Sequence, residues 1–373
     1  MNLSDLARNS HMLRGSLSKR GYMRWWHSFS GIQSETGETR RFFVEFFIIN
    51  PGLGKSRPVL GQHPYFKKRG MKPSYVMVKA GVFPDEAGNG GRQLHAFYPI
   101  STLQATGSPL IMQVKDPHIG HCLYSEDRLT GSVQVTSREA RHRSRMTDAG
   151  CMEWDVKVNK AVSCHTGALG GRLAEVFRKL DSYWHGEGIR SFFQGSVILD
   201  GVSYEVSSES SYGYADKHWG RGFQNPWFQF ACGKLTSART GNTLRHSVVA
   251  LNCVCPKFLF FPLRPRLVLQ LTYMGEDFQF TRCKWETKET SKRFIWHVLG
   301  QNKDAVVKLS GSCTKREMLH LQYEDPDGNK EARPLWGGCG GIGTLELFRK
   351  VSGTRECMDT LKLADALCIY RES

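Results

Sequence analysis

Short segments in which apolar and polar residues alternate recur along most of the chain. Alternation with a period of two is typical of a β-strand that buries one face. Turn-forming residues separate the segments, as at Asp200-Gly201. The pattern predicts nine strands, at Tyr75 to Lys79, Gly131 to Val135, Trp154 to Val158, Ser196 to Leu199, Val248 to Cys253, Leu267 to Tyr273, Val306 to Leu309, Leu319 to Tyr323 and Leu345 to Phe348.

Helical periodicity is rare in the sequence. It is clear only at Leu173 to Tyr183, where four apolar residues share one face, and weaker at Met358 to Leu367. Many short strands with few helices favour antiparallel barrels or sandwiches over a parallel α/β sheet. We therefore expect a mainly β protein with few short helices.

The length of 373 residues is that of two ordinary domains. Alternation resumes after Gly188, so we place the domain boundary there, with one domain at residues 1–188 and the other at 189–373. A hydrophobic content of 40% with 23% charged residues is typical of a chain that buries a core.

Basic residues outnumber acidic ones, with 51 Lys and Arg against 35 Asp and Glu. The excess is spread along the chain, and no helix-turn-helix, zinc-finger or RNA-binding signature accompanies it. We therefore expect no nucleic-acid partner. The basic surface is either simply solvated or attracted to an anionic membrane, where a hydrophobic substrate would reside.

The eleven cysteines are scattered and include no Cys-x-x-Cys unit, which argues against a disulfide framework and a structural zinc site. Residues 1–20 contain no apolar run, and the longest apolar stretch is broken by Pro262 and Pro265. We expect neither a signal peptide nor a transmembrane segment, and a location in the cytoplasm or at a membrane surface.

Two short motifs imitate nucleotide-binding signatures. His118-Ile119-Gly120-His121 matches the ATP-binding letters of class I aminoacyl-tRNA synthetases, and Gly338 to Gly343 matches a dinucleotide fingerprint. Each leads into a predicted strand where a helix is required. The sequence therefore predicts no nucleotide, metal or other cofactor.

One segment carries a more specific pattern. Asp200-Gly201-Val202-Ser203-Tyr204 is followed by Tyr214-Ala215-Asp216-Lys217-His218-Trp219-Gly220, then by Gly222-Phe223 and Trp227. This order and spacing resemble the central motif of the tocopherol cyclase family, in which a DG-x-x-Y hairpin precedes an acidic-Lys-Asn-Trp-Gly element. The resemblance extends to the aromatic run Gly21 to His27 and to Phe42 to Pro51, and more weakly to Gly337 to Gly343.

The resemblance implies two lipocalin-like antiparallel β-barrels, a fold that the family shares with carotenoid hydratases. It places the Asp-Lys-His-Trp-Gly motif in the C-terminal domain. It also implies cofactor-independent chemistry, in which an alkene is protonated in an apolar cavity and the cation is captured by a phenol oxygen or by water. Such chemistry requires an acid with a raised pKa, aromatic faces and a dry cavity.

The motif supplies residues for each role. We assign Asp216 as the acid, with Lys217 and His218 tuning its charge. Substrate binding is assigned to eight further residues, which are Trp219, Phe223, Trp227, Tyr214, Trp25, Trp26, Glu45 and His121. For each residue the alternative is structural, either an ion pair at a strand end or an aromatic core side chain.

The sequence departs from the family at the pocket. The family's Asn is His218, the Pro after Gly-Phe is Gln224, and Gln229-Phe230-Ala231 replaces Trp-x-Gln. The leading hypothesis is a cyclase that acts on a hydrophobic prenylated alkene or quinol. The alternatives are a lipid or prenyl-quinone carrier, an olefin hydratase, and a basic structural or interaction protein.

Overall fold

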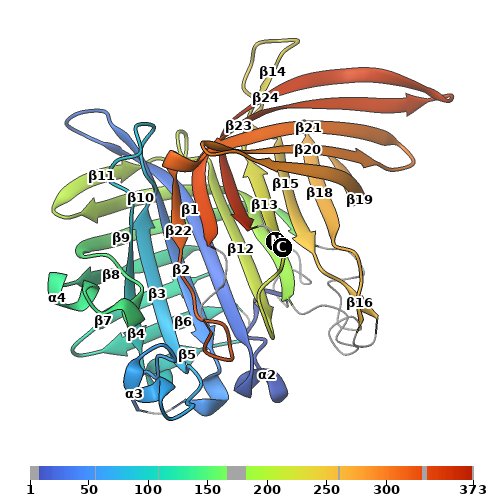
Figure 1. Cartoon of the computed structure of the whole chain (residues 1–373). Helices are drawn as coiled ribbons and strands as arrows, with labels where there is room; N and C mark the ends of the chain where they lie inside the picture. The colour runs from blue at the N-terminus through green and yellow to red at the C-terminus, as the bar shows by residue number, and fades with distance from the viewer. Residues whose placement is uncertain are drawn as a thin grey trace.

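The structure is a computed structural model that describes residues 8–54, 56–107, 109–165, 182–258, 261–329 and 334–371. Within these ranges the chain is mainly β and forms two closed antiparallel β-barrels, which confirms the predicted fold class (Figure 1). The helical elements there are short, namely α2 (Ser16–Lys19), α3 (Pro64–Lys67), α4 (Ser137–Ala140), η1 (Pro51–Leu53), η2 (Ile100–Thr102), η3 (Arg143–Arg145) and η5 (Lys315–Glu317).

Twelve strands of the described ranges form the first sheet, and neighbouring strands along the chain mostly pair. β12 (Gly213–Gly220) lies between β1 and β10 and pairs with both. The other strands follow the order β4 (Arg92–Tyr98), β3 (Tyr75–Val82), β2 (Thr39–Ile49), β1 (Tyr22–Gln33), β11 (Val202–Val206), β10 (Ser182–Leu199), β9 (Gly150–His165), β8 (Arg128–Val135), β7 (Gly120–Ser125), β6 (Ile111–Asp116) and β5 (Leu103–Ala105).

Ten strands of the described ranges form the second sheet, and pairing between β23 and β24 closes it into a ring. β16 (Lys257–Phe258) and β17 (Phe261–Pro262) form a separate small hairpin. The order in the second sheet is β14 (Lys234–Ser237), β24 (Thr354–Arg371), β13 (Trp227–Cys232), β15 (Val248–Val254), β18 (Arg266–Tyr273), β19 (Glu276–Glu289), β20 (Arg293–Gln301), β21 (Ala305–Thr314), β23 (Leu335–Val351) and β22 (Met318–Leu321).

The chain passes from the first sheet to the second between Gly220 and Trp227. β10, β11 and β12 therefore belong to the first sheet, and the Asp-Lys-His-Trp-Gly motif lies on β12 in that sheet. This passage lies after the boundary expected near residue 188. Whether each sheet folds as a domain of its own stays a prediction.

Three clusters of buried apolar residues make up the core. One fills the first barrel, one fills the second, and the third lies where the two barrels meet. The third cluster joins residues of both sheets, such as Trp26 and Phe47 of the first and Trp227 and Ile369 of the second. Figure 1 shows the two sheets side by side, with β1, β12 and β13 close to their junction.

The meeting of the barrels explains the long apolar runs at the start of the sequence. On β1, Met23 and Trp25 enter the first barrel, whereas Tyr22 and Trp26 face the second sheet. Successive side chains of a strand point to opposite faces, and here both faces are covered. Successive residues of the aromatic run therefore belong in turn to two different buried faces.

The strand predictions are largely confirmed. Eight of the nine predicted segments lie inside observed strands, and the ninth overlaps β22, which ends at Leu321. The helix predicted at Met358 to Leu367 is wrong, because this segment is part of β24 and pairs with β23 along its length. Most of the helix predicted at Leu173 to Tyr183 lies outside the described residues, and Tyr183 itself is in β10. In the ranges that the structure describes, no helix has the length and apolarity needed to cross a membrane.

Candidate functional site

Charged and polar side chains are buried between the two barrels, on the outer face of the first sheet. β12 contributes Asp216 and His218, β1 contributes Arg24, and β2 contributes Glu45. All four side chains are fully buried. Register explains their proximity, because Arg24 lies opposite His218, and Trp26 lies opposite both Asp216 and Glu45. We call these four residues the Arg24 cluster.

Asp216 accepts hydrogen bonds through one carboxylate oxygen, Oδ2. The Trp184 indole donates at 3.0 Å, the Tyr214 hydroxyl at 2.9 Å and the Gln229 amide at 2.6 Å. His218 Nε2 lies 3.1 Å from the same oxygen. Gln229 belongs to β13, so one oxygen atom of the first sheet is bound by the second sheet as well.

Burial on its own raises the pKa of Asp216, but His218, Arg24 and the Tyr214 hydrogen bond outweigh it, and the net pKa lies below the ordinary value. Asp216 is therefore ionised at neutral pH. The donors around Oδ2 stabilise this charged form, whereas the predicted role of Asp216 as the acid requires a raised pKa.

Burial lowers the pKa of His218 below its ordinary value, although Asp216 opposes the shift. The imidazole is therefore neutral at pH 7. Because Oδ2 of Asp216 is an acceptor, we assign the proton to Nε2 of His218. This tautomer leaves a lone pair on Nδ1, which has no hydrogen-bond partner in the described part of the chain.

Arg24 lies between the two carboxylates. Its Nη2 is 3.7 Å from Oδ1 of Asp216, and its Nη1 is 3.7 Å from Oε1 of Glu45. Tyr323 joins both partners, since its hydroxyl donates to Glu45 Oε2 at 2.8 Å and accepts from Arg24 at 3.2 Å. The guanidinium thus balances two buried negative charges, which a buried ion pair requires.

Lys79 of β3 completes the charge balance on the side of Glu45. Its Nζ lies 3.5 Å from Oε2 of Glu45 and donates to the Gln322 carbonyl at 3.1 Å. Burial lowers the pKa of Lys79 to about 8, even though Glu45 favours the charged form. Two cations therefore face two carboxylates in this region.

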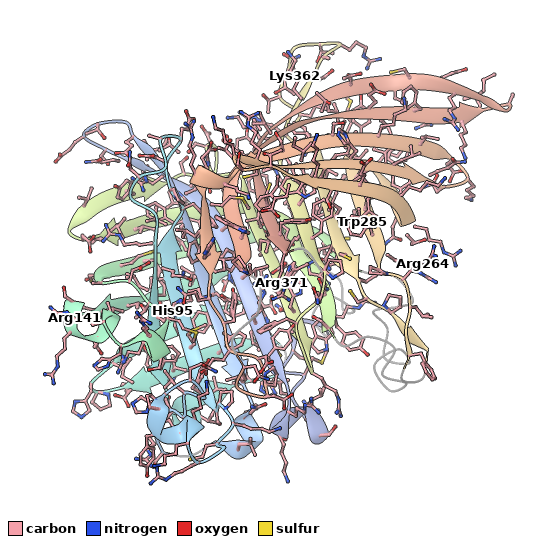
Figure 2. All side chains as sticks on the ribbon, viewed as in Figure 1. His95, Arg141, Arg264, Trp285, Lys362 and Arg371 are labelled. Atoms are coloured by element: carbon pink, nitrogen blue, oxygen red, sulfur yellow. The ribbon has the colours of Figure 1, made fainter. Side chains whose placement is uncertain are left out.

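Aromatic rings enclose the Arg24 cluster. The Arg24 guanidinium lies 4.8 Å from the Trp227 ring and 5.4 Å from the Trp26 ring. His218 is 5.0 Å from Trp227, which also contacts Phe223 at 5.9 Å. Figure 2 shows Arg371 in the middle of the molecule, where its guanidinium lies 6.0 Å from the Trp227 ring. The Trp26 and Trp227 rings therefore both contact the cationic guanidinium of Arg24.

Several polar atoms of this region have no hydrogen-bond partner among the described residues, although they are buried. Most buried polar groups in proteins are hydrogen-bonded, so such a concentration calls for an explanation. A polar group of a bound ligand would satisfy donors and acceptors together. The atoms are Arg24 Nε and Nη2, Trp26 Nε1, Glu45 Oε1, Asp216 Oδ1 and His218 Nδ1.

A cavity of about 470 Å³ lies between the barrels, and Tyr214 is one of its lining residues. Ile189, Ala231 and Leu367 are among its apolar walls. The Tyr214 hydroxyl donates to Asp216, so one residue connects the lining of the cavity to the Arg24 cluster. Arg41, Lys234 and Asp365 also line the cavity, and both cations form ion pairs with Asp365.

Lys217, Trp219 and Trp25 lie on the opposite side of their strands, inside the first barrel. Lys217 donates to the carbonyls of Arg8 and Ser10, and its ammonium lies 4.8 Å from the Trp219 ring. The alternation of strand side chains separates these residues from Asp216 and His218. Lys217, Trp219 and Trp25 therefore do not face the space between the barrels, and their predicted roles stay predictions.

His121 lies outside the site. It is an exposed residue of β7, opposite Lys115 of β6. By contrast, Tyr214, Trp26, Glu45, Phe223 and Trp227 all lie between the barrels, as substrate-binding residues of such a site would. Their roles in binding stay predictions.

Sequence reasoning missed Arg24, Lys79, Trp184, Gln229 and Tyr323. Arg24 had a signal, because a charged residue inside the aromatic run Tyr22 to Trp26 predicts a buried charge. Gln229 was noted only as a departure from the family, yet it donates to both Tyr214 and Asp216 at 2.6 Å. Within the described ranges, no group of three or more His, Cys, Asp or Glu residues is arranged to hold a metal ion.

No known family model matches the sequence, and no curated protein sequence matches it. The solved structures that are similar to this chain include the following two. One is a candidate AttH protein from Nitrosomonas europaea, with a TM-score of 0.46 and 11% identity over 92% of each chain. The other is kievitone hydratase from Nectria haematococca, with a TM-score of 0.43 and 11% identity over 94% of this chain and 89% of that chain. Neither likeness bears on the activity of this chain.

Proposed function

We propose that this chain is a tocopherol cyclase-like enzyme that closes a ring in a hydrophobic prenylated quinol bound between its two barrels. The observation that carries the proposal is the buried Asp216–His218 pair, with Nδ1 of His218 unpartnered and Trp227 beside it. A carboxylate that orients an imidazole is a common arrangement for proton transfer in enzymes.

His218 would act first as an acid and then as a base. Its imidazolium donates the Nδ1 proton to an alkene carbon, which leaves a tertiary cation on the ligand. The phenol oxygen then attacks this cation while Nδ1 accepts the phenol proton, so the imidazolium is restored. The net reaction is an isomerisation and needs no cofactor or co-reactant.

Asp216 would serve as the positioning residue for this proton transfer. Its carboxylate holds Nε2 of His218 at 3.1 Å and provides a negative charge beside the imidazolium. The lowered pKa of His218 makes the imidazolium a stronger acid than an ordinary histidine, which suits protonation of an alkene. Lys217, on the other face of β12, has no part in this step.

The surroundings suit a ligand with an apolar body and one oxygen-bearing ring. Trp26 and Trp227 would stabilise the cation through their ring faces. Unpartnered donors of Arg24 and Trp26 would bind a ligand oxygen, and the cavity of about 470 Å³ that Tyr214 lines would hold the prenyl chain. A location at an anionic membrane surface, where such a ligand partitions, stays part of the proposal.

Turnover of a prenylated hydroquinone tests the proposal. We expect the purified protein to convert it to a chromanol of equal mass, detected by chromatography and mass spectrometry. His218→Asn and Asp216→Asn should abolish conversion, while His121→Asn, which changes an exposed histidine, should leave it unchanged. Equal activity in the His218 variant and wild type would overturn the assignment.

A carrier function is the second candidate, because the residues that line the cavity include Tyr214 but no member of the Arg24 cluster. A carrier would bind the hydroquinone and return it unchanged. Ligand binding measured by fluorescence, with no product after long incubation, would favour the carrier. Oxygen from labelled water in the product would instead indicate a hydratase.

A further inference from the structure

Arg190 is a buried arginine outside the proposed catalytic site. It lies on β10, where the pairing with β9 is irregular on both sides of it. Only 4% of the residue is exposed. Irregular pairing of this kind redirects side chains, and here it turns the guanidinium toward the loop before β12 and toward the second sheet.

The Arg190 guanidinium has no acidic partner among the residues that the structure describes. Its Nη1 donates to the Gly233 carbonyl at 2.7 Å, and its carbon lies 4.7 Å from the Tyr212 ring and 4.9 Å from the Phe192 ring. Nε is buried without a hydrogen-bond partner, and no carboxylate among the described residues lies within ion-pair distance of Arg190. Burial lowers the pKa of Arg190, although Tyr212 and Cys232 oppose the shift.

A buried cation without a counter-charge is costly, because desolvation of an unpaired ion amounts to several kcal/mol. Two other buried cations among the described residues have carboxylate partners. Arg24 faces two carboxylates, and Lys160 faces Glu126 and Glu187. Arg190 is thus prepared for an anion that the described protein residues do not supply.

Arg190 opens onto a second cavity of about 630 Å³. Lys157, Arg245 and His246 line this cavity and add positive charge, while Asp127 and Glu209 contribute two carboxylates. Neutral donors are also present, from Asn159, Gln194 and Ser208. Cationic side chains together with amide and hydroxyl donors are suited to binding a carboxylate or phosphate group.

We propose that this second cavity is a binding site for a small carboxylate- or phosphate-bearing molecule, held at Arg190. Glu209 and Tyr212 line both this cavity and the cavity of about 470 Å³ between the barrels, so the two sites are adjacent. The anion site does not depend on the proposed cyclase activity, since it uses none of the residues of the Arg24 cluster.

Calorimetric titration of the full chain with inorganic phosphate and, separately, with acetate tests the site. Ionic strength is kept constant with sodium chloride, so that general screening does not contribute. We expect saturable binding of at least one anion. The anion with the lower dissociation constant then shows whether the site prefers a phosphate group or a carboxylate.

Variants locate the binding. Arg190→Gln should raise the dissociation constant of the anion at least about tenfold, because the substitution removes a hydrogen bond from a charged group. Arg190→Lys keeps the positive charge but loses the planar guanidinium, so it should raise the dissociation constant less. Arg264→Gln is the control, because Arg264 is exposed at the periphery of the molecule (Figure 2).

A folding defect in Arg190→Gln would be seen by circular dichroism. In that case Arg245→Gln decides, because Arg245 is exposed, lines the same cavity and should weaken binding severalfold without loss of fold. The proposal is overturned by an absence of saturable binding to either anion, or by equal effects of the Arg264 and cavity variants.

Discussion

Asp216 and Trp219 lie three residues apart on β12 and point to opposite sides of it. Asp216 faces the second sheet, where Gln229 donates to its carboxylate, and Trp219 faces the interior of the first barrel. A motif that reads as one unit in the sequence therefore serves two places in the fold. The side between the barrels carries the Asp216–His218 pair, and the other side closes the first core and holds the N-terminal segment.

Two tryptophan substitutions should separate these roles. Trp227 and Trp219 are both buried, so Trp227→Phe and Trp219→Phe should each lower the free energy of unfolding by about 1–3 kcal/mol. Only Trp227→Phe should weaken binding of a prenylated hydroquinone, measured by fluorescence titration. An equal loss of binding in the Trp219 variant would place the ligand inside the first barrel.

Removal of the Arg24 guanidinium should be strongly destabilising. Arg24→Met leaves Asp216 and Glu45 buried without their shared cation, which should cost about 3–5 kcal/mol in denaturant unfolding. Arg141→Met is the matched control, because Arg141 is exposed at the edge of the molecule (Figure 2), and it should change stability by less than about 0.5 kcal/mol. Similar effects of the two changes would contradict the charge balance described for the site.

Lys79 should give the protein a specific dependence on alkaline pH. Its pKa falls from 10.5 to about 8 on folding. Between these two values the unfolded chain binds a proton that the folded chain does not, so this lysine makes stability rise with pH by up to about 3 kcal/mol. Comparison of wild type with Lys79→Met by denaturant unfolding from pH 7 to 10.5 should show this rise in wild type only. Lys67→Met, at an exposed site, should behave as wild type does.

The proton-transfer role of His218 predicts an acidic optimum. Because its imidazolium is the acid and its pKa lies below the ordinary 6.5, kcat/KM should increase as pH falls through this range and level off below that pKa. Asp216→Asn removes the negative charge that favours the imidazolium, so any residual activity should shift to lower pH. A profile that rises toward alkaline pH would indicate that a neutral base starts the reaction.

Much of the fold was predictable, because strand alternation is a local property. The nine predicted segments follow the observed strands closely, and the helix predicted at Met358 to Leu367 failed because β24 buries residues on both faces near the junction of the barrels. Burial on both faces of the strands is also the reason why the sequence did not indicate the site. Which face of β12 meets the second sheet is decided by pairing with β1 and β10, far away in sequence.

The resemblance to the tocopherol cyclase family indicated the right segment but not the partners of its residues. Arg24 and Gln229 reach Asp216 from other strands, and neither is part of the motif. The pKa of Asp216 was expected to rise with burial, which is the correct direction for burial alone. The sequence does not show how many donors surround one carboxylate oxygen, and these donors reverse the shift.

The position of a bound ligand tests the proposed function most directly. A crystal structure of Asp216→Asn, the variant expected to bind without turnover, should be determined with a prenylated hydroquinone. We predict density for the prenyl chain in the cavity that Tyr214 lines, with the hydroquinone ring beside Trp227 and its oxygen near Nδ1 of His218. Density inside the first barrel against Trp25 and Trp219, with the space between the barrels unchanged, would contradict the proposal.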